Sequence, residues 1–267
     1  MSTNKQIHDE LMNVETKFND KKIKGVNLST FASFLSDQKF LPSSSVIEKD
    51  FEEALSGKAV SDENKALNSA NVERMYGFNA EFKDIYSGED KTPNEFGNDS
   101  NSEFNNKFMF LALNQAFRPD KNDMTGWINF HNRDGKHDSA MLKFRLEIND
   151  LDYYGCYITD IFKNVVDSNS GKVMKSPVAD ENSEEFKNCA NILAQEISIV
   201  KPEKIIVLGG DAFDSLKKMA KLDIFGDNTE VVKNATLATH YSDPNTPKYI
   251  TWFNKKRPAL MDRIAEK

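Results

Sequence analysis

The stretch that decides the fold is Lys204-Ile205-Ile206-Val207-Leu208-Gly209-Gly210-Asp211-Ala212-Phe213-Asp214-Ser215-Leu216. A short apolar run ends at two glycines, and a segment with helical spacing that begins at an aspartate follows at once. This order is typical of a buried parallel strand that leads through a tight turn into a helix N-terminus. Ligands bind at the edge of open α/β sheets where such turns lie. The stretch therefore predicts the fold class and the edge at which a site is expected.

Other segments of the chain repeat this alternation of strand and helix. Apolar runs at 108–113 and 154–161 predict two more strands, and a last strand is predicted at 235–239. Apolar residues with helical spacing predict helices over 184–200 and 211–220. Strands that alternate with helices form parallel sheets with helices on both faces. We expect a three-layer α/β/α sandwich around a mostly parallel central sheet of about four strands.

The first hundred residues differ in texture from the rest. Strand signals are scarce there, and a polar, turn-rich segment follows at 88–106. We therefore expect a helical N-terminal extension over 1–104 and the α/β/α domain over 105–267. The stretches of the extension with helical spacing are 7–18, 28–40 and 46–55.

Composition limits the class of protein. The chain has 267 residues, of which 39% are apolar and 19 are phenylalanine, so it can build a sizeable core. A net charge of −7 argues against a protein that coats nucleic acid generally, although it allows a local basic groove. Its two cysteines, Cys156 and Cys189, form neither a disulfide framework nor a zinc ribbon. With no apolar leader and no run of about 18 apolar residues, a cytoplasmic protein without a membrane partner is expected.

Polar side chains follow three of the expected strands. Asn114 follows the first strand, Asp160 stands at the end of the second, and His240 follows the last. The carboxyl ends of parallel strands meet at one edge of a sheet, so a carboxamide, a carboxylate and an imidazole would share one cleft. Such a set can orient a water molecule and stabilise charge on a leaving group.

Four segments resemble the uracil-DNA glycosylase superfamily. Tyr157-Ile158-Thr159-Asp160-Ile161-Phe162-Lys163 resembles its "YITNVVK" segment, especially in the thermophile-type, iron–sulfur-containing branch. Residues 202–209 resemble the proline and strand ending in "LG" of that branch, and 237–242 resemble its "LATYHPS". Residues 112–116 stand where the superfamily has "GQDPY", "GINPG" or "GEAPG". The order and spacing agree over residues 107–255.

The resemblance implies a DNA glycosylase that hydrolyses the N-glycosidic bond of a flipped or single-stranded nucleotide. Carried over by position, Asn114 would orient the attacking water, and His240 would donate a hydrogen bond to the departing base. Asp160 would read the Watson–Crick edge of that base. The remaining implied contacts are stacking on the base by Phe130 or its rival Phe117, and phosphate binding by Ser242.

Some positions depart from the superfamily pattern. Asp160 replaces the asparagine that recognises uracil, and an ionised carboxylate only accepts hydrogen bonds. An amino-bearing edge, such as N4 of cytosine, would suit it better than O4 of uracil. Asn164 occupies one cluster-ligand position, and only Cys189 matches a ligand cysteine. We therefore expect no iron–sulfur cluster, no metal and no other cofactor, with DNA or a nucleotide as the partner.

The sequence leaves a second function open. The first motif lacks its usual glycine and proline, because Ala112 and Gln115 stand in their places. Asn114 could simply cap a turn, and Asp160 could pair with Lys163. A non-catalytic nucleotide-, nucleic-acid- or protein-binding member of the same fold is the alternative, and the acidic net charge favours it somewhat.

Overall fold

The computed structural model describes residues 4–14, 28, 31–35, 104–115, 151–153, 155–167, 169–238, 261–262 and 264–265. The chain divides into two compact units, and the first consists of residues 1–36, 91–130 and 153–239. All elements discussed below belong to this first unit. They are α1 (Asn4–Met12), β1 (Ala32–Phe34), β2 (Asn105–Gln115), β3 (Cys156–Val166), α6 (Ser170–Val173), η2 (Pro177–Ala179), α7 (Glu184–Val200), β4 (Lys204–Leu208), α8 (Gly210–Met219), η3 (Gly226–Asn228), α9 (Thr229–Lys233) and β5 (Thr236–Ala238).

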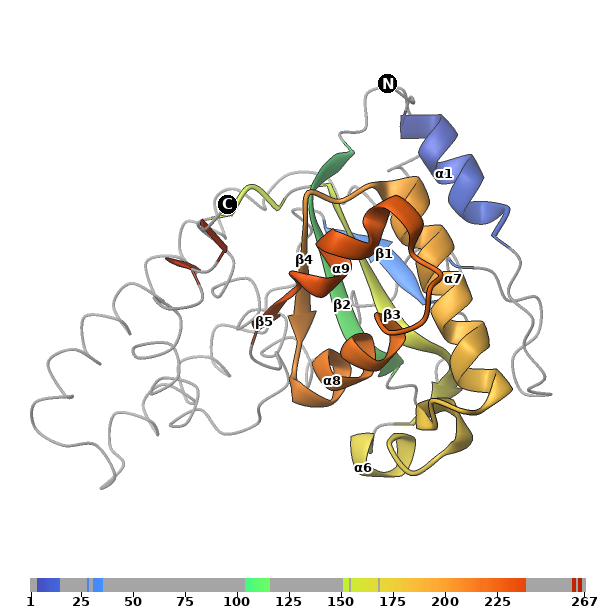
Figure 1. Ribbon diagram of the computed structural model, residues 1–267. Helices are drawn as coiled ribbons and strands as arrows, with labels where there is room; N and C mark the ends of the chain where they lie inside the picture. The colour runs from blue at the N-terminus through green and yellow to red at the C-terminus, as the bar shows by residue number, and fades with distance from the viewer. Residues whose placement is uncertain are drawn as a thin grey trace, which may run out of the picture. The chain divides into compact units, whose positions relative to one another are not determined.

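The described strands form one five-stranded sheet in the order β1-β3-β2-β4-β5 (Figure 1). β3, β2, β4 and β5 run parallel, and β1 pairs antiparallel with β3 at one edge. Residues 205–208 of β4 are all buried, as expected for a parallel strand that packs on both faces. The predicted α/β class with a mostly parallel central sheet and an N-terminal helix is confirmed.

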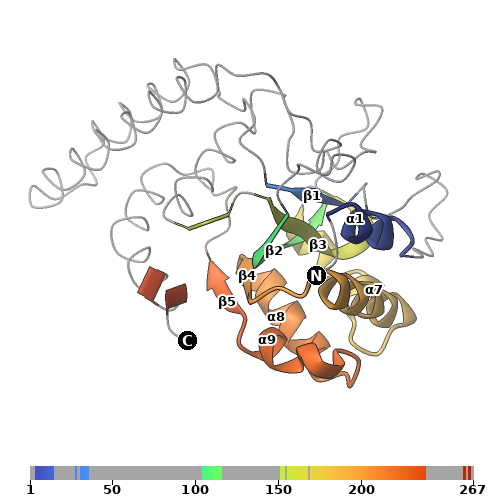
Figure 2. The ribbon, with the colours of Figure 1, turned by 90° about the horizontal axis from the view of Figure 1, so that it is seen from above.

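Helices α1, α7, α8 and α9 lie on one side of this sheet (Figure 2). Leu11 of α1, Leu193 of α7 and Leu216 of α8 belong to the same buried apolar cluster as alternate residues of the central strands. Leu111 and Val207 are among those strand residues, and both are fully buried. Helices α7 and α8 therefore bury apolar stripes against this face of the sheet, and α1 packs on α7.

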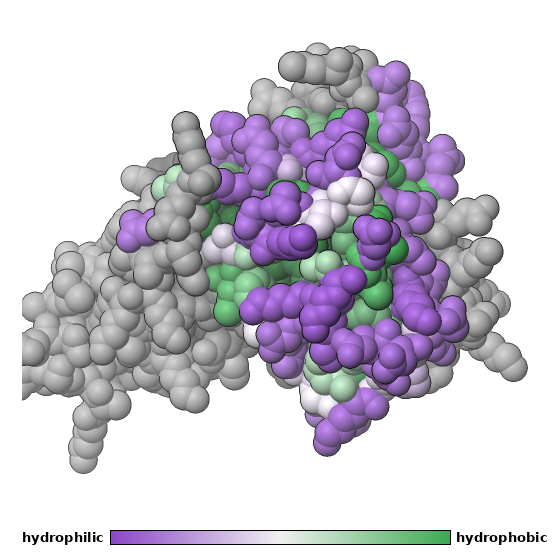
Figure 3. All heavy atoms as spheres, in the orientation of Figure 1, coloured by the Kyte–Doolittle hydropathy of each residue, from purple (hydrophilic) through white to green (hydrophobic). Residues whose placement is uncertain are grey.

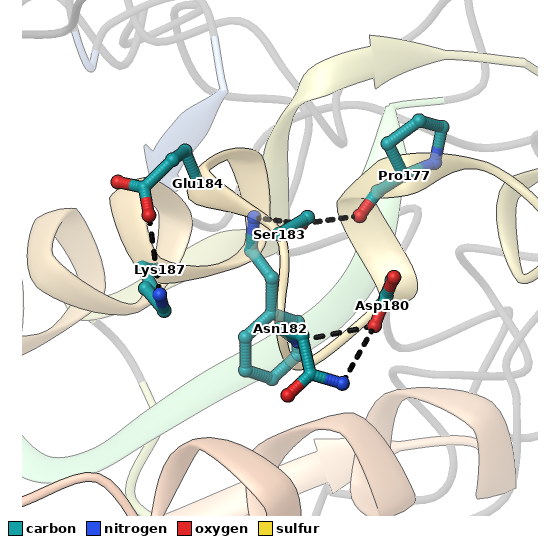
Figure 4. Close-up of polar contacts among 7 residues, drawn as sticks. Pro177, Asp180, Asn182, Ser183, Glu184 and Lys187 are labelled. Carbon is teal, nitrogen blue, oxygen red and sulfur yellow. Dashed lines mark hydrogen bonds and ion pairs between the residues drawn. The ribbon is translucent and has the colours of Figure 1, made fainter.

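Local signals fix both ends of α7, and Figure 4 shows its start. Ser183 is its N-cap, and Oγ of Ser183 accepts a hydrogen bond from the main-chain nitrogen of Phe186 over 3.0 Å. The same hydroxyl donates to the main-chain oxygen of Pro177 over 2.6 Å. At the other end, Lys201 adopts a left-handed conformation with φ of 49°, and Pro202 follows. A serine N-cap and a proline just after the C-cap are common at helix ends, so the sequence predicts these bounds well.

The segment at 28–40 departs from expectation. Its spacing predicts a helix, but residues 32–34 form β1, and residues 31–35 are all buried. Short apolar runs fit a strand or a helix equally well. The edge of β3 decides the outcome, because Ala32 pairs with Thr159 and Phe34 with Tyr157. The expected helix at 46–55 lies outside the described residues.

Figure 3 shows hydrophilic side chains over much of the described surface on the helical side, with hydrophobic ones visible between them. Between α8 and α9 lies a groove of about 190 Å³, lined by Phe213, Leu216, Lys217, Ala220, Lys221, Val232, Lys233 and Ala235.

Within the part of the chain that the structure describes, no helix is long and apolar enough to cross a membrane.

Candidate active site

The carboxyl ends of β2, β3, β4 and β5 share one edge of the sheet, because these strands are parallel. β2 has β3 on one side and β4 on the other, so the order of the chain reverses at β2. Open α/β sheets bind ligands outside the carboxyl ends of the strands at such a switch point. The candidate site therefore lies at the end of β2, where Asn114 and Gln115 stand.

Asn114 is half-buried, and its side-chain amide is held by the main chain. Nδ2 donates hydrogen bonds to the oxygens of Gln115 at 3.0 Å, Val165 at 3.4 Å and Asp167 at 2.8 Å. Carbonyl oxygens only accept, so they fix which end of the amide carries the hydrogens. Among the described residues, none donates a hydrogen bond to Oδ1 of Asn114. The carbonyl end of the amide is thus turned away from the strands' main-chain acceptors.

Asp160 is fully buried inside β3 rather than at its end. Its strand runs five residues beyond the expected end at Ile161, to Val166. Asp160 pairs with Ala112, which stands two residues before Asn114 on β2. Side chains of a strand alternate between faces, so Asp160 and Asn114 share one face of the sheet. This is the face opposite α7, since Tyr157 and Thr159 hydrogen-bond to Glu196 of α7.

The structure therefore brings two of the six expected site residues to one face. The other four lie outside the described residues: His240, Phe117, Phe130 and Ser242. The side chain of Asn164 also lies outside them. β5 ends at Ala238, two residues before His240 in the sequence.

The sequence matches the family model of the uracil DNA glycosylase superfamily over residues 102–267. The chain belongs to the uracil-DNA glycosylase superfamily. The resemblance expected from four short motifs is thus confirmed, and the mixed sheet with its helices is consistent with the α/β/α fold of this superfamily. Searches of curated proteins and of solved structures returned no significant match. At the family level, membership indicates glycosylase-type hydrolysis in DNA repair.

In this member of the superfamily, a buried ion pair lies behind β3. Nζ of Lys163 lies 2.6 Å from Oε2 of Glu196, and both side chains are fully buried. Oε1 of Glu196 accepts hydrogen bonds from the hydroxyl of Tyr157 at 2.9 Å and of Thr159 at 2.8 Å. Burial, together with the negative charge of Glu196 and its hydrogen bond, raises the pKa of Tyr157 well above its ordinary value. These four residues, Tyr157, Thr159, Lys163 and Glu196, are called the ion-pair cluster below.

Sequence reasoning missed Glu196. The spacing of apolar residues predicts helix α7 but by itself gives no role to this glutamate. The available signal was a glutamate on the apolar stripe of α7, between Leu193 and Val200. Acidic residues are almost never fully buried unless they are paired, so this position predicts a buried partner.

The glycine turn after β4 serves the sheet. Gly209 has φ of 94° and ψ of 155°, a conformation that is essentially restricted to glycine. Its N–H donates to the main-chain oxygen of Ala238 over 3.1 Å, which ties the turn to β5. The turn therefore packs strand against helix, as expected for a pair of glycines without a full dinucleotide fingerprint.

The described residues include no group of three or more His, Cys, Asp or Glu side chains that could hold a metal ion. Cys156 lies in β3 and Cys189 in α7, and both are buried free thiols. The groove between α8 and α9 is lined by neither Asn114 nor Asp160, so it is separate from the candidate site. The expected absence of a cluster and of other cofactors remains a prediction.

Proposed function

We propose that this protein is a divergent DNA glycosylase that hydrolyses the N-glycosidic bond of a flipped or single-stranded nucleotide. The observation that carries the proposal is the amide of Asn114, fixed by main-chain oxygens at the end of β2 within the residues that match the superfamily. This geometry leaves Oδ1 available to accept a hydrogen bond from a water molecule. The same edge of the sheet is where such folds bind ligands.

In this mechanism Asn114 positions the attacking water rather than deprotonating it, because an amide has no basic group in the neutral range. The sugar develops oxocarbenium character as the bond to the base breaks. His240, by its place in the motif at 237–242, donates a hydrogen bond to the departing anionic base. Water orientation and leaving-group stabilisation together make the reaction a hydrolysis that needs no cofactor.

Asp160 reads the Watson–Crick edge of the flipped base in this proposal. Its carboxylate is fully buried, and hydrogen bonds to a charged acceptor are stronger where water is excluded. A carboxylate accepts from an amino group but offers no donor to O4 of uracil. The preferred base therefore carries an exocyclic amino group, and uracil is a poorer substrate.

Further contacts of the proposal come from positions that the motifs assign. Phe130 or its rival Phe117 stacks on the flipped base, and Ser242 with nearby main-chain amides holds a phosphate. The catalytic domain in this proposal spans 105–267, preceded by the extension over 1–104, and the protein acts on DNA in the cytoplasm.

The proposed reaction is monofunctional. A lyase-type glycosylase needs a lysine that can form a Schiff base with the sugar. Lys163, the lysine nearest Asp160 along β3, is fully buried and paired with Glu196, which argues against that role.

The test is an abasic-site assay on single- and double-stranded oligonucleotides that contain uracil, xanthine, hypoxanthine, mismatches or modified cytosines. Product is expected from at least one substrate, with loss of product in both Asn114→Ala and His240→Ala. If no substrate yields product while nucleotides raise the melting temperature, the protein is a binding module instead.

A further inference from the structure

The ion-pair cluster packs α7 against β3, but the desolvation free energy of its two charges is unfavourable. Lys163 and Glu196 are both fully buried, and removing two ions from water is strongly unfavourable. Apolar side chains of similar size would pack the same interface at least as stably. The cluster therefore calls for a role beyond packing.

One contact of the cluster points toward the candidate site. Besides its ion pair with Glu196, Nζ of Lys163 donates a hydrogen bond to the main-chain oxygen of Asp160. Lys163 thus bridges the carboxylate of α7 and the main chain of the candidate base-reading residue. The N–H of Asp160 is also held, because it donates to the oxygen of Phe31, the residue before β1, over 3.3 Å.

The hydrogen-bonded pairing of β3 with β2 becomes irregular just beyond Asp160. The pairing of β2 with β3 is regular from Met109 and Tyr157 to Asn114 and Phe162, and its register then shifts before Gln115 and Val166. Lys163 lies within this irregular part of β3. Its side chain donates to the main-chain oxygen of Asp160, three residues earlier. This hydrogen bond holds the main chain of β3 next to the place where its pairing with β2 is irregular.

Side chains on the two faces of β3 have different surroundings. Tyr157 and Thr159 point to α7, where both donate to Oε1 of Glu196. Asp160 points to the opposite face by the alternation of the strand. A shift of its main-chain carbonyl moves its Cα, and with it the direction in which the carboxylate points.

We propose that Glu196 and Lys163 are positioning residues, whose buried ion pair holds the main-chain oxygen of Asp160 and thereby sets the direction of its carboxylate at the base pocket. The part of this inference that concerns base selection rests on the proposed function. Neither residue touches the substrate, so both act through Asp160.

A charge-free double variant separates positioning from stability. Lys163→Met with Glu196→Gln removes both charges, so no unpaired ion remains buried, whereas each single variant leaves one behind. We expect the double variant to unfold at a denaturant midpoint close to that of the wild type, and both singles to unfold at clearly lower midpoints. In the double variant the donor to Asp160 is nevertheless lost.

The matched control is Tyr157→Phe. It removes a hydrogen bond to Glu196 but leaves Lys163 on the oxygen of Asp160. We expect a lower unfolding midpoint in this control, with the ratio of kcat/KM between bases unchanged. The double variant should instead lose about tenfold or more of that ratio, equivalent to about 1.4 kcal/mol of discrimination.

A second readout does not depend on activity. In protein with ¹³C-labelled aspartate, the main-chain carbonyl resonance of Asp160 should move in the double variant and stay in place in Tyr157→Phe. An unmoved resonance in the double variant overturns the inference, whether or not the wild type is active. A moved resonance with unchanged discrimination in an active enzyme also overturns it.

The activity assay and the Asp160 resonance distinguish failure of the glycosylase proposal from failure of the positioning proposal. If the wild type yields no product from any substrate, the glycosylase proposal fails. A moved Asp160 resonance would then still show that the ion pair positions the main chain of Asp160.

Discussion

Nδ2 of Asn114 lies 2.8 Å from the main-chain oxygen of Asp167, so the end of β2 is tied to the chain that leaves β3. Two further main-chain oxygens, of Gln115 and Val165, accept from the same nitrogen. The amide thus joins two strand ends with its nitrogen while its oxygen is turned away from them. One side chain serves both the fold and the proposed chemistry, and substitutions can separate these two tasks.

Asn114→Asp is expected to destabilise the protein more than Asn114→Ala. A carboxylate cannot donate to the three main-chain oxygens and repels them, whereas alanine only leaves them without this donor. We expect losses of about 2–4 kcal/mol for aspartate and about 1–3 kcal/mol for alanine in the free energy of unfolding. Urea denaturation measures both. An aspartate variant as stable as the wild type would show that these three hydrogen bonds contribute nothing to the stability of the fold.

Asp160→Asn is expected to shift the preference for the base toward uracil. An asparagine side chain offers an N–H donor to O4 of uracil as well as an acceptor, and a carboxylate offers only acceptors. The ratio of product from uracil to product from amino-bearing bases should rise about tenfold or more, which corresponds to one gained hydrogen bond. Asp223→Asn, on an exposed residue after α8, is the control and should leave the ratio unchanged. An unaltered ratio of products in Asp160→Asn would show that this residue does not contact the base.

Tyr157 should make the protein less stable at alkaline pH. Burial first, and the charge of Glu196 second, raise the pKa of Tyr157 in the folded state above its ordinary value of 10.0. Above about pH 10 the unfolded chain loses this proton while the folded protein keeps it, so stability falls as the pH rises. The slope from this one group reaches at most about 1.4 kcal/mol per pH unit.

Tyr157→Phe removes that component, so its stability should fall less steeply with pH than that of the wild type. Urea midpoints between about pH 8 and about pH 11 give the comparison. Equal slopes for the two proteins would mean that the hydroxyl of Tyr157 titrates normally in the folded state.

Ser183→Ala should weaken α7 at its start. The substitution removes the acceptor for the N–H of Phe186 and the donor to the oxygen of Pro177, at an expected cost of about 1–2 kcal/mol. Lys187→Gln is the control, because it removes only the exposed ion pair with Glu184 at 3.1 Å, worth less than about 0.5 kcal/mol. Thermal unfolding of both variants tests the difference. Equal effects would contradict the role of the N-cap.

The adjacent glycines after β4 should respond in opposite ways to alanine. Gly209→Ala places a side chain on a backbone with φ of 94° and should cost about 1–3 kcal/mol. Gly210 is the first residue of α8 with open space around an added Cβ, so Gly210→Ala should be neutral or stabilise by up to about 1 kcal/mol. Denaturant unfolding of the two variants checks the contrast. Matching losses at both positions would show that the second glycine also serves a close approach.

Several elements were predictable because their signals are local. The bounds of α7 agree with those expected from the sequence, since Ser183 caps its start and Pro202 follows its end. The strand, turn and helix at 204–219 also form as expected, because an apolar run, a glycine pair and an amphipathic segment follow one another directly. The superfamily was recognisable for the same reason, as its motifs are short and continuous.

Other features depended on partners far away in the chain. Residues 32–34 form a strand because the edge of β3 offers main-chain partners that the local pattern cannot reveal. Asp160 lies inside β3, not at its end, because β2 pairs with residues beyond it. Asn114 was expected at a strand end, but its contacts with Val165 and Asp167 are set by the neighbouring strand.

The sequence by itself determined the order of the four parallel strands with helices α7 and α8, and the superfamily, because helix caps, turns and apolar periodicity act over a few residues. Only the tertiary structure decided which side chains meet. Lys163 and Glu196 stand far apart in the sequence, yet they pair in the core over 2.6 Å. Packing α7 against β3 removes both ions from water, and burial leaves each of them stable only beside the other.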